Sequence, residues 1–112
     1  MSQAVEGSSF GIDERIDEDG ALRLALRGEL DMAVSDVLTR RLSELKQRKA
    51  LVRLDLAGLE FMDSSGLQAV ITALVDSRQD GWTLEIADDV ADPVARLIDI
   101  AGVRSRFWPP HD

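Results

Sequence analysis

Hydrophobic residues follow two different spacings along the chain. In residues 21–27 they occupy every second position, which predicts a β-strand with one buried face. In residues 64–79 they recur three and four positions apart, which predicts an amphipathic helix. The same criteria applied to the whole chain predict strands at 10–16, 21–27, 51–56 and 82–86, helices at 31–49, 64–79 and 93–101, and a short edge strand at 103–108.

Turn and capping residues separate these segments. Residues 17–20 end in Asp-Gly and predict a tight turn, so the first two strands form a hairpin. Gly81 is expected to end the second helix. Asp92 is expected to cap the third helix, with Pro93 at its first position and Gly102 at its C-terminal cap.

The predicted order β-β-α-β-α-β-α-(β) indicates an α/β fold. After the opening hairpin, strands and helices alternate, and short β-α-β connections require parallel neighbouring strands. The expected architecture is therefore a mixed β-sheet with helices packed against it. The 112 residues suffice for a single domain. Residues 1–9 are expected to be a flexible leader, residues 10–108 the domain, and residues 109–112 a tail.

The composition is acidic and lacks the residues of most catalytic centres. Lys and Arg number 13 and Asp and Glu 21, so the net charge is −8, whereas a nucleic-acid binder requires a basic face. Cysteine is absent and the single histidine, His111, adjoins the C-terminus, so we expect no metal site and no cofactor. Membrane-spanning runs and a signal-peptide pattern are also missing, which predicts a cytoplasmic protein.

The segment that can carry chemistry is Asp63-Ser64-Ser65-Gly66. A strand ends, a loop containing Gly58 is expected to turn the chain, and two hydroxyls open the helix at 64–79. One serine can cap the helix, and the other can face solvent at the positive end of the helix dipole, where an anion is tolerated. From local physics alone, a plain N-cap without further function remains the simpler interpretation.

Enzymatic interpretations of this segment find no support. A nucleophile elbow requires Gly-x-Ser-x-Gly with a histidine base, but Met62 occupies the first glycine position and His111 lies in the tail. No glycine-rich phosphate-binding loop occurs. The acidic runs at 17–19 and 88–89 lack the spacing of a calcium loop and are interpreted as solvated turns. We therefore assign no catalytic residue.

Three stretches of the chain resemble one known family. They are residues 28–31 (GELD), residues 55–67 (DLAGLEFMDSSGL) and residues 94–103 (VARLIDIAGV). In this order and spacing they are similar to the STAS domain and, more narrowly, to the bacterial anti-sigma-factor antagonists. The resemblance covers roughly residues 10–107. It implies a mixed sheet flanked by helices, in agreement with the predicted element order.

The resemblance also implies a phosphorylation switch. In that family, the serine directly after the Asp of the central motif is phosphorylated by the anti-sigma factor, a serine kinase of the GHKL type. The matching position is Ser64. The unphosphorylated antagonist binds the anti-sigma factor and releases a sigma factor, which regulates transcription, and a PP2C-type phosphatase restores that state. The residues expected near the phosphoacceptor or in partner binding are Asp31, Asp63, Ser65, Gly66 and Met62.

Several points stay open in the sequence. Phe61 is expected in the core, whereas Met62 is undecided between the core and a surface contact. The first helix, which starts near Val34, is a candidate part of the binding face. The competing function is that of a STAS subunit in a lipid-trafficking ABC transport assembly, which docks on a transporter without being phosphorylated. A STAS element of a larger stress-signalling assembly is a third possibility.

Overall fold

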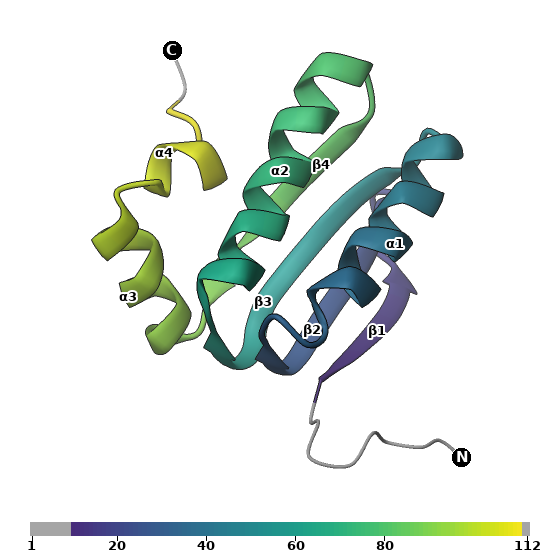
Figure 1. The fold of residues 1–112 in the computed structure, drawn as a ribbon. Helices are drawn as coiled ribbons and strands as arrows, with labels where there is room; N and C mark the ends of the chain where they lie inside the picture. Colours follow the sequence, from purple (N-terminus) through teal and green to yellow (C-terminus); the bar gives the residue numbers. More distant parts are fainter. Residues whose placement is uncertain (1–9, 111–112) are drawn as a thin grey trace, which may run out of the picture.

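The computed structural model describes residues 10–110 and shows a four-stranded sheet with four helices in that part of the chain (Figure 1). The predicted leader and the last two residues lie outside the described residues. The elements are β1 (Gly11–Ile16), β2 (Leu22–Leu30), α1 (Ser35–Gln47), β3 (Leu51–Met62), α2 (Ser64–Asp80), β4 (Thr83–Val90), α3 (Asp92–Ala101) and α4 (Arg104–Phe107).

The sheet has the order β1-β2-β3-β4. β1 pairs antiparallel with β2 as the predicted hairpin, and β2, β3 and β4 are parallel. The predicted mixed sheet is therefore confirmed. Because β2 and β3 run in the same direction, their carboxyl ends lie at one edge of the sheet, and α1 and α2 follow from that edge (Figure 1).

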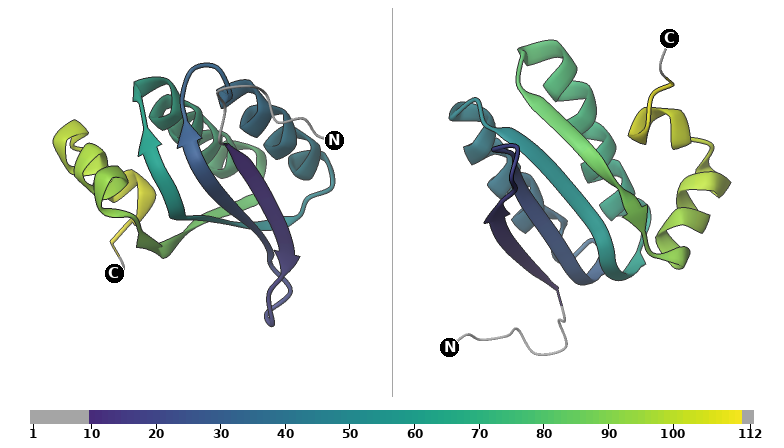
Figure 2. Two further views of the ribbon diagram at one scale, coloured as in Figure 1. Left: turned by 90° about the horizontal axis from the view of Figure 1, so that it is seen from below. Right: turned by 180° about the vertical axis from the view of Figure 1, so that it is seen from behind.

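α1 and α2 cover one face of the sheet, and the hydrophobic core lies between them and the strands (Figure 2). The alternating leucines of β2 and β3 point to this face, since Leu24, Leu26, Leu54 and Leu56 are all buried. α3 packs against β3, and α4 packs against α2. The core is built from residues of both spacings: Leu24, Leu26, Leu30, Leu38, Leu42, Leu45, Val52, Leu54, Leu56, Leu59, Val70, Leu74, Val94, Ile98 and Phe107.

The opposite face of the sheet carries a network of ion pairs. The Arg53 guanidinium lies 2.7 Å from Asp17, 2.6 Å from Asp19 and 2.7 Å from Glu85. Hydrogen bonds from Arg53 hold the pKa of Asp19 down to about 2. Asp17 also accepts a hydrogen bond from Arg23 at 2.9 Å. These carboxylates of the 17–19 turn are thus engaged by arginines of the sheet.

Two predicted elements differ from the structure. β3 continues to Met62, so Gly58 lies inside a strand and does not turn the chain. Residues 103–108 do not form an edge strand, because Arg104–Phe107 form the helix α4. Val103 and Phe107 are four positions apart and pack toward the core, which is helical spacing. The Trp108 indole then donates a hydrogen bond to the Ile86 carbonyl at 3.2 Å.

The two predicted glycine caps agree with the structure, α1 ends two residues earlier than expected, at Gln47, and two N-termini differ. Gly81 and Gly102 end α2 and α3 in the left-handed conformation, as predicted. α1 begins at Ser35 and not at Asp31. Asp92 is the first residue of α3 and does not cap it; the N-cap position is Ala91.

Candidate functional site

The Asp-Ser-Ser-Gly segment lies at the start of α2, directly after the end of β3. Ser64 is the first residue of α2 and is exposed, whereas Ser65 is half-buried. Within residues 10–110, no hydrogen bond engages the Ser64 hydroxyl. This placement agrees with the expectation that one serine oxygen at the helix start faces solvent.

Asp63, and not a serine, is the N-cap of α2. Its Oδ1 accepts a hydrogen bond from the Gly66 backbone N–H at 2.9 Å. Its Oδ2 accepts a second one from the Met32 N–H at 3.2 Å, and its own N–H donates to the Leu30 carbonyl at 3.2 Å. The sequence-based assignment of the cap to a serine is therefore wrong. Asp63 ties the start of α2 to the β2–α1 connection and leaves the Ser64 hydroxyl free.

Gly66 lies in the first turn of α2, in close contact with the end of β2. A Cβ added at Gly66 would lie 2.6 Å from the Leu30 carbonyl oxygen and 2.8 Å from Leu30 Cγ. Only glycine allows this approach, because real Cβ atoms do not come so near a backbone oxygen. Gly66 is buried, so its place in the motif is explained by packing and not by surface contact with a partner.

The structure contradicts the expected core position of Phe61 and decides the open position of Met62. Met62 is 5% exposed and belongs to the core, so it is not a surface contact, whereas Phe61 is 46% exposed. The β2–β3 register shifts twice, between Ala25 and Arg27 and between Gly28 and Glu29, and Met62 is paired with Leu30. Each one-residue shift exchanges the two faces of a strand, so the two together leave Met62 on the same face as Leu54 and Leu56. Phe61 thereby points to the sheet face that α1 and α2 do not cover.

Asp31 and Met32 form part of the same edge. Asp31 is half-buried, and its Oδ1 accepts a hydrogen bond from the Ala33 N–H at 3.0 Å. Met32 is 74% exposed, although its backbone N–H is bound by Asp63. Sequence reasoning missed Met32 as a surface residue of the site. The available signal was its position outside the helical stripe that begins at Val34.

The chain segments next to Ser64 carry acidic residues and no basic ones. No lysine or arginine occurs at positions 28–39 or 54–77, which include the β2–α1 connection, the end of β3 and most of α2. Glu29, Asp31, Asp36, Glu60 and Asp63 fall in these stretches. A phosphate on Ser64 would thus find helix N–H groups but no cationic side chain from either stretch. The negative charge of the phosphate would therefore not be neutralised by these stretches and would face a bound partner.

The described part of the chain shows neither a metal-binding cluster nor a membrane-spanning helix. Among residues 10–110, no three His, Cys, Asp or Glu side chains are arranged to hold a metal ion. None of the helices in this range is long and apolar enough to cross a bilayer.

We expect Asp63→Ala to destabilise the protein by about 1–2 kcal/mol, because it removes the cap of α2. Asp63→Asn should cost less, since asparagine also caps helices well. Some stability should still be lost, because the amide nitrogen of asparagine cannot accept a hydrogen bond from the Met32 N–H. The free energy of unfolding of both variants is measured by urea denaturation. Asp89→Ala, at an exposed carboxylate of β4, serves as the control. An Asp63→Ala variant as stable as this control would contradict the capping role.

Comparisons with known proteins agree with this geometry. The family described as "Mlab, STAS domain" matches residues 15–105. An anti-sigma F factor antagonist of Paenibacillus polymyxa is 37% identical over 95 residues, which are 83% of this chain and 80% of that protein. An anti-sigma-B factor antagonist of Bacillus subtilis is 25% identical over 96 residues, 86% of each chain.

A solved structure shows the same fold. The crystal structure of an anti-sigma factor antagonist from Mycobacterium paratuberculosis superposes with a TM-score of 0.77. The match covers 96% of this chain and 92% of that one at 19% sequence identity. At this identity the similarity concerns the arrangement of the strands and helices.

Proposed function

Because this chain belongs to the STAS domain family, among the anti-sigma-factor antagonists, we propose that it binds an anti-sigma factor and that phosphorylation of Ser64 ends this binding. The observation that carries the proposal is the exposed Ser64 hydroxyl at the start of α2, with Asp63 already serving as the cap. In its unphosphorylated form the protein would occupy the anti-sigma factor in the cytoplasm and free a sigma factor for transcription.

In this proposal the protein is a substrate and a binding partner, not an enzyme. The anti-sigma factor, a serine kinase of the GHKL type, binds ATP and magnesium and provides the catalytic base. The Ser64 Oγ attacks the γ-phosphorus of ATP, its proton passes to the base of the kinase, and ADP leaves. A PP2C-type phosphatase then hydrolyses the phosphoserine with water and returns the free hydroxyl and inorganic phosphate.

The local structure supports a switch that does not require refolding. A phosphate adds about −1.5 to −2 charges at pH 7. Helix N-termini tolerate anions, so α2 can remain folded with the phosphate at its first residue. The free hydroxyl and the relatives' names favour this function over a docking subunit of a lipid-trafficking ABC assembly, which would need no phosphoacceptor.

A phosphorylation assay tests the proposal. The full chain is incubated with the anti-sigma factor kinases of its own organism and Mg·ATP, and the product is mapped by mass spectrometry. We expect one phosphate on Ser64, its loss in Ser64→Ala and its retention in Ser65→Ala. A phosphate at a position outside this motif would refute the site, and no phosphate from any of the kinases would support the docking-subunit function.

A further inference from the structure

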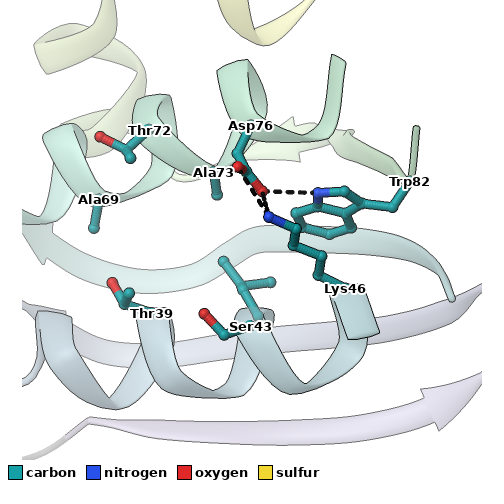
Figure 3. Close-up of a pocket in the computed structure, with 9 residues that line it drawn as sticks. Thr39, Ser43, Lys46, Ala69, Thr72, Ala73, Asp76 and Trp82 are labelled. Carbon is teal, nitrogen blue, oxygen red and sulfur yellow. Dashed lines mark hydrogen bonds and ion pairs between the residues drawn. The ribbon is translucent and has the colours of Figure 1, made fainter. Parts of the chain in front are cut away.

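A hollow of about 310 Å³ lies between α1 and α2, on the side of the helices away from the sheet (Figure 3). Both helices contribute positions three and four residues apart, so the hollow runs along their facing sides. It is called the interhelical groove below. Its lining residues are Thr39, Leu42, Ser43 and Lys46 of α1, Ala69, Thr72, Ala73 and Asp76 of α2, and Trp82.

Small side chains leave this groove open, and an ion pair closes one of its ends. Ala69 and Ala73 on α2 face Thr39 and Ser43 on α1, and none of these side chains is long enough to fill the space (Figure 3). At the closed end, Lys46 lies 3.0 Å from Asp76, which also accepts a hydrogen bond from the Trp82 indole at 3.0 Å. The charges at this end are thus already paired.

The groove continues a surface of α2 that starts at Ser64. Residues 64–75 include no charged residue, although 30% of the chain is charged. Ser64, Gln68 and Thr72 are exposed and four positions apart, so they lie on one side of the helix. A second hollow of about 340 Å³ along α2 shares Thr72 and Asp76 with the groove. Depletion of charge is the compositional mark of the buried centre of a protein interface.

We propose that the protein that binds at Ser64 also extends along α2 and inserts an uncharged, apolar side chain into the interhelical groove. The proposal rests on the proposed function, because its occupant is the anti-sigma factor that phosphorylates Ser64. The volume fits one or two large side chains. Lys46 and Asp76, the charged residues of the lining, are paired with each other, so the walls offer no free counter-charge to a cation or an anion. The groove would provide affinity that is separate from the phosphoacceptor itself.

Two substitutions on opposite walls test the groove. Thr72→Arg and Ser43→Arg each place a long charged side chain at its rim, at exposed helical positions where arginine is a good helix former. Thr83→Arg makes the same change at an exposed position of β4 and serves as the matched control. Circular dichroism verifies the fold of each, and if one groove variant fails to fold, the other decides.

Binding of the full chain to the anti-sigma factor that phosphorylates Ser64 is measured by isothermal titration calorimetry. We expect the affinity of both groove variants to be lower by a factor of about 10 or more, as for residues at the centre of an interface. Thr83→Arg should bind as tightly as the wild type does. In phosphorylation kinetics the KM should rise while kcat at saturation is kept, because the groove binds the partner but does not contact the reacting atoms.

The outcomes separate this proposal from the proposed function. If Ser64 is phosphorylated and both groove variants bind like the wild type, the groove proposal is overturned and the switch at Ser64 stands. If both groove variants and Thr83→Arg lose affinity equally, the effect is one of added charge, and the groove proposal is likewise overturned. If no anti-sigma factor binds or phosphorylates the wild-type chain, both proposals fail together.

Discussion

Phosphorylation of Ser64 is expected to weaken binding of the anti-sigma factor by at least about a hundredfold, whereas Ser64→Ala should bind like the wild type. If a carboxylate of the partner lies about 5 Å from Ser64 at an effective dielectric constant near 20, each added unit of charge costs roughly 3 kcal/mol. That is about a hundredfold in affinity for one unit of charge, and a phosphate adds about 1.5 to 2 units. No lysine or arginine at positions 28–39 or 54–77 is present to offset the new charge.

Titration of the phosphorylated chain, Ser64→Asp and Ser64→Ala against the anti-sigma factor measures this effect. Ser64→Asp adds one unit of charge and should weaken binding in the same direction as the phosphate does. Ser105→Asp serves as the control, because it adds the same charge far from Ser64. It lies on α4, which contacts Arg78 near the far end of α2. That end is about 20 Å from Ser64 at 1.5 Å per residue. Equal affinities of Ser64→Ala and Ser64→Asp would refute the charge mechanism.

Gly66→Ala is expected to lower the free energy of unfolding by about 2–3 kcal/mol, although alanine is the better helix former. The added Cβ would lie 2.6 Å from the Leu30 carbonyl oxygen, which belongs to the backbone of β2 and cannot rotate away. The first turn of α2 must therefore move outward from β2. Because Ser64 lies in that turn, phosphorylation by the kinase should slow as well.

Gly81→Ala separates this packing effect from an effect of backbone conformation. Gly81 has a φ of 76° and no atom within 4 Å of an added Cβ, so alanine there costs only the strain of the left-handed conformation, about 1–2 kcal/mol. Urea unfolding and phosphorylation rates of both variants are compared. We expect Gly81→Ala to keep the rate of the wild type. A Gly66→Ala variant with normal stability and normal phosphorylation would show that the contact with Leu30 imposes no constraint.

The site was predictable in its position but not in its details. The Asp-Ser-Ser-Gly sequence after a strand and before an apolar helical stripe places a hydroxyl at a helix start, and Ser64 lies there. That Asp63 caps α2 and also binds the Met32 N–H depends on two segments 31 positions apart. No local pattern reports such a contact, so both the cap assignment and the exposure of Met32 were missed.

The sequence by itself determined the kinds and order of the elements as far as α3, the acidic charge and the place of the phosphoacceptor candidate, whereas the last element is a helix and not the expected strand. These follow from spacing, glycine positions and composition, which are properties of neighbouring residues. The tertiary structure decided which side chains surround Ser64: β3 continued to Met62, which is buried in the core while Phe61 is exposed, and helix packing left the interhelical groove open. Register and packing arise between segments distant along the chain, so their outcome is fixed only when the sheet and helices assemble.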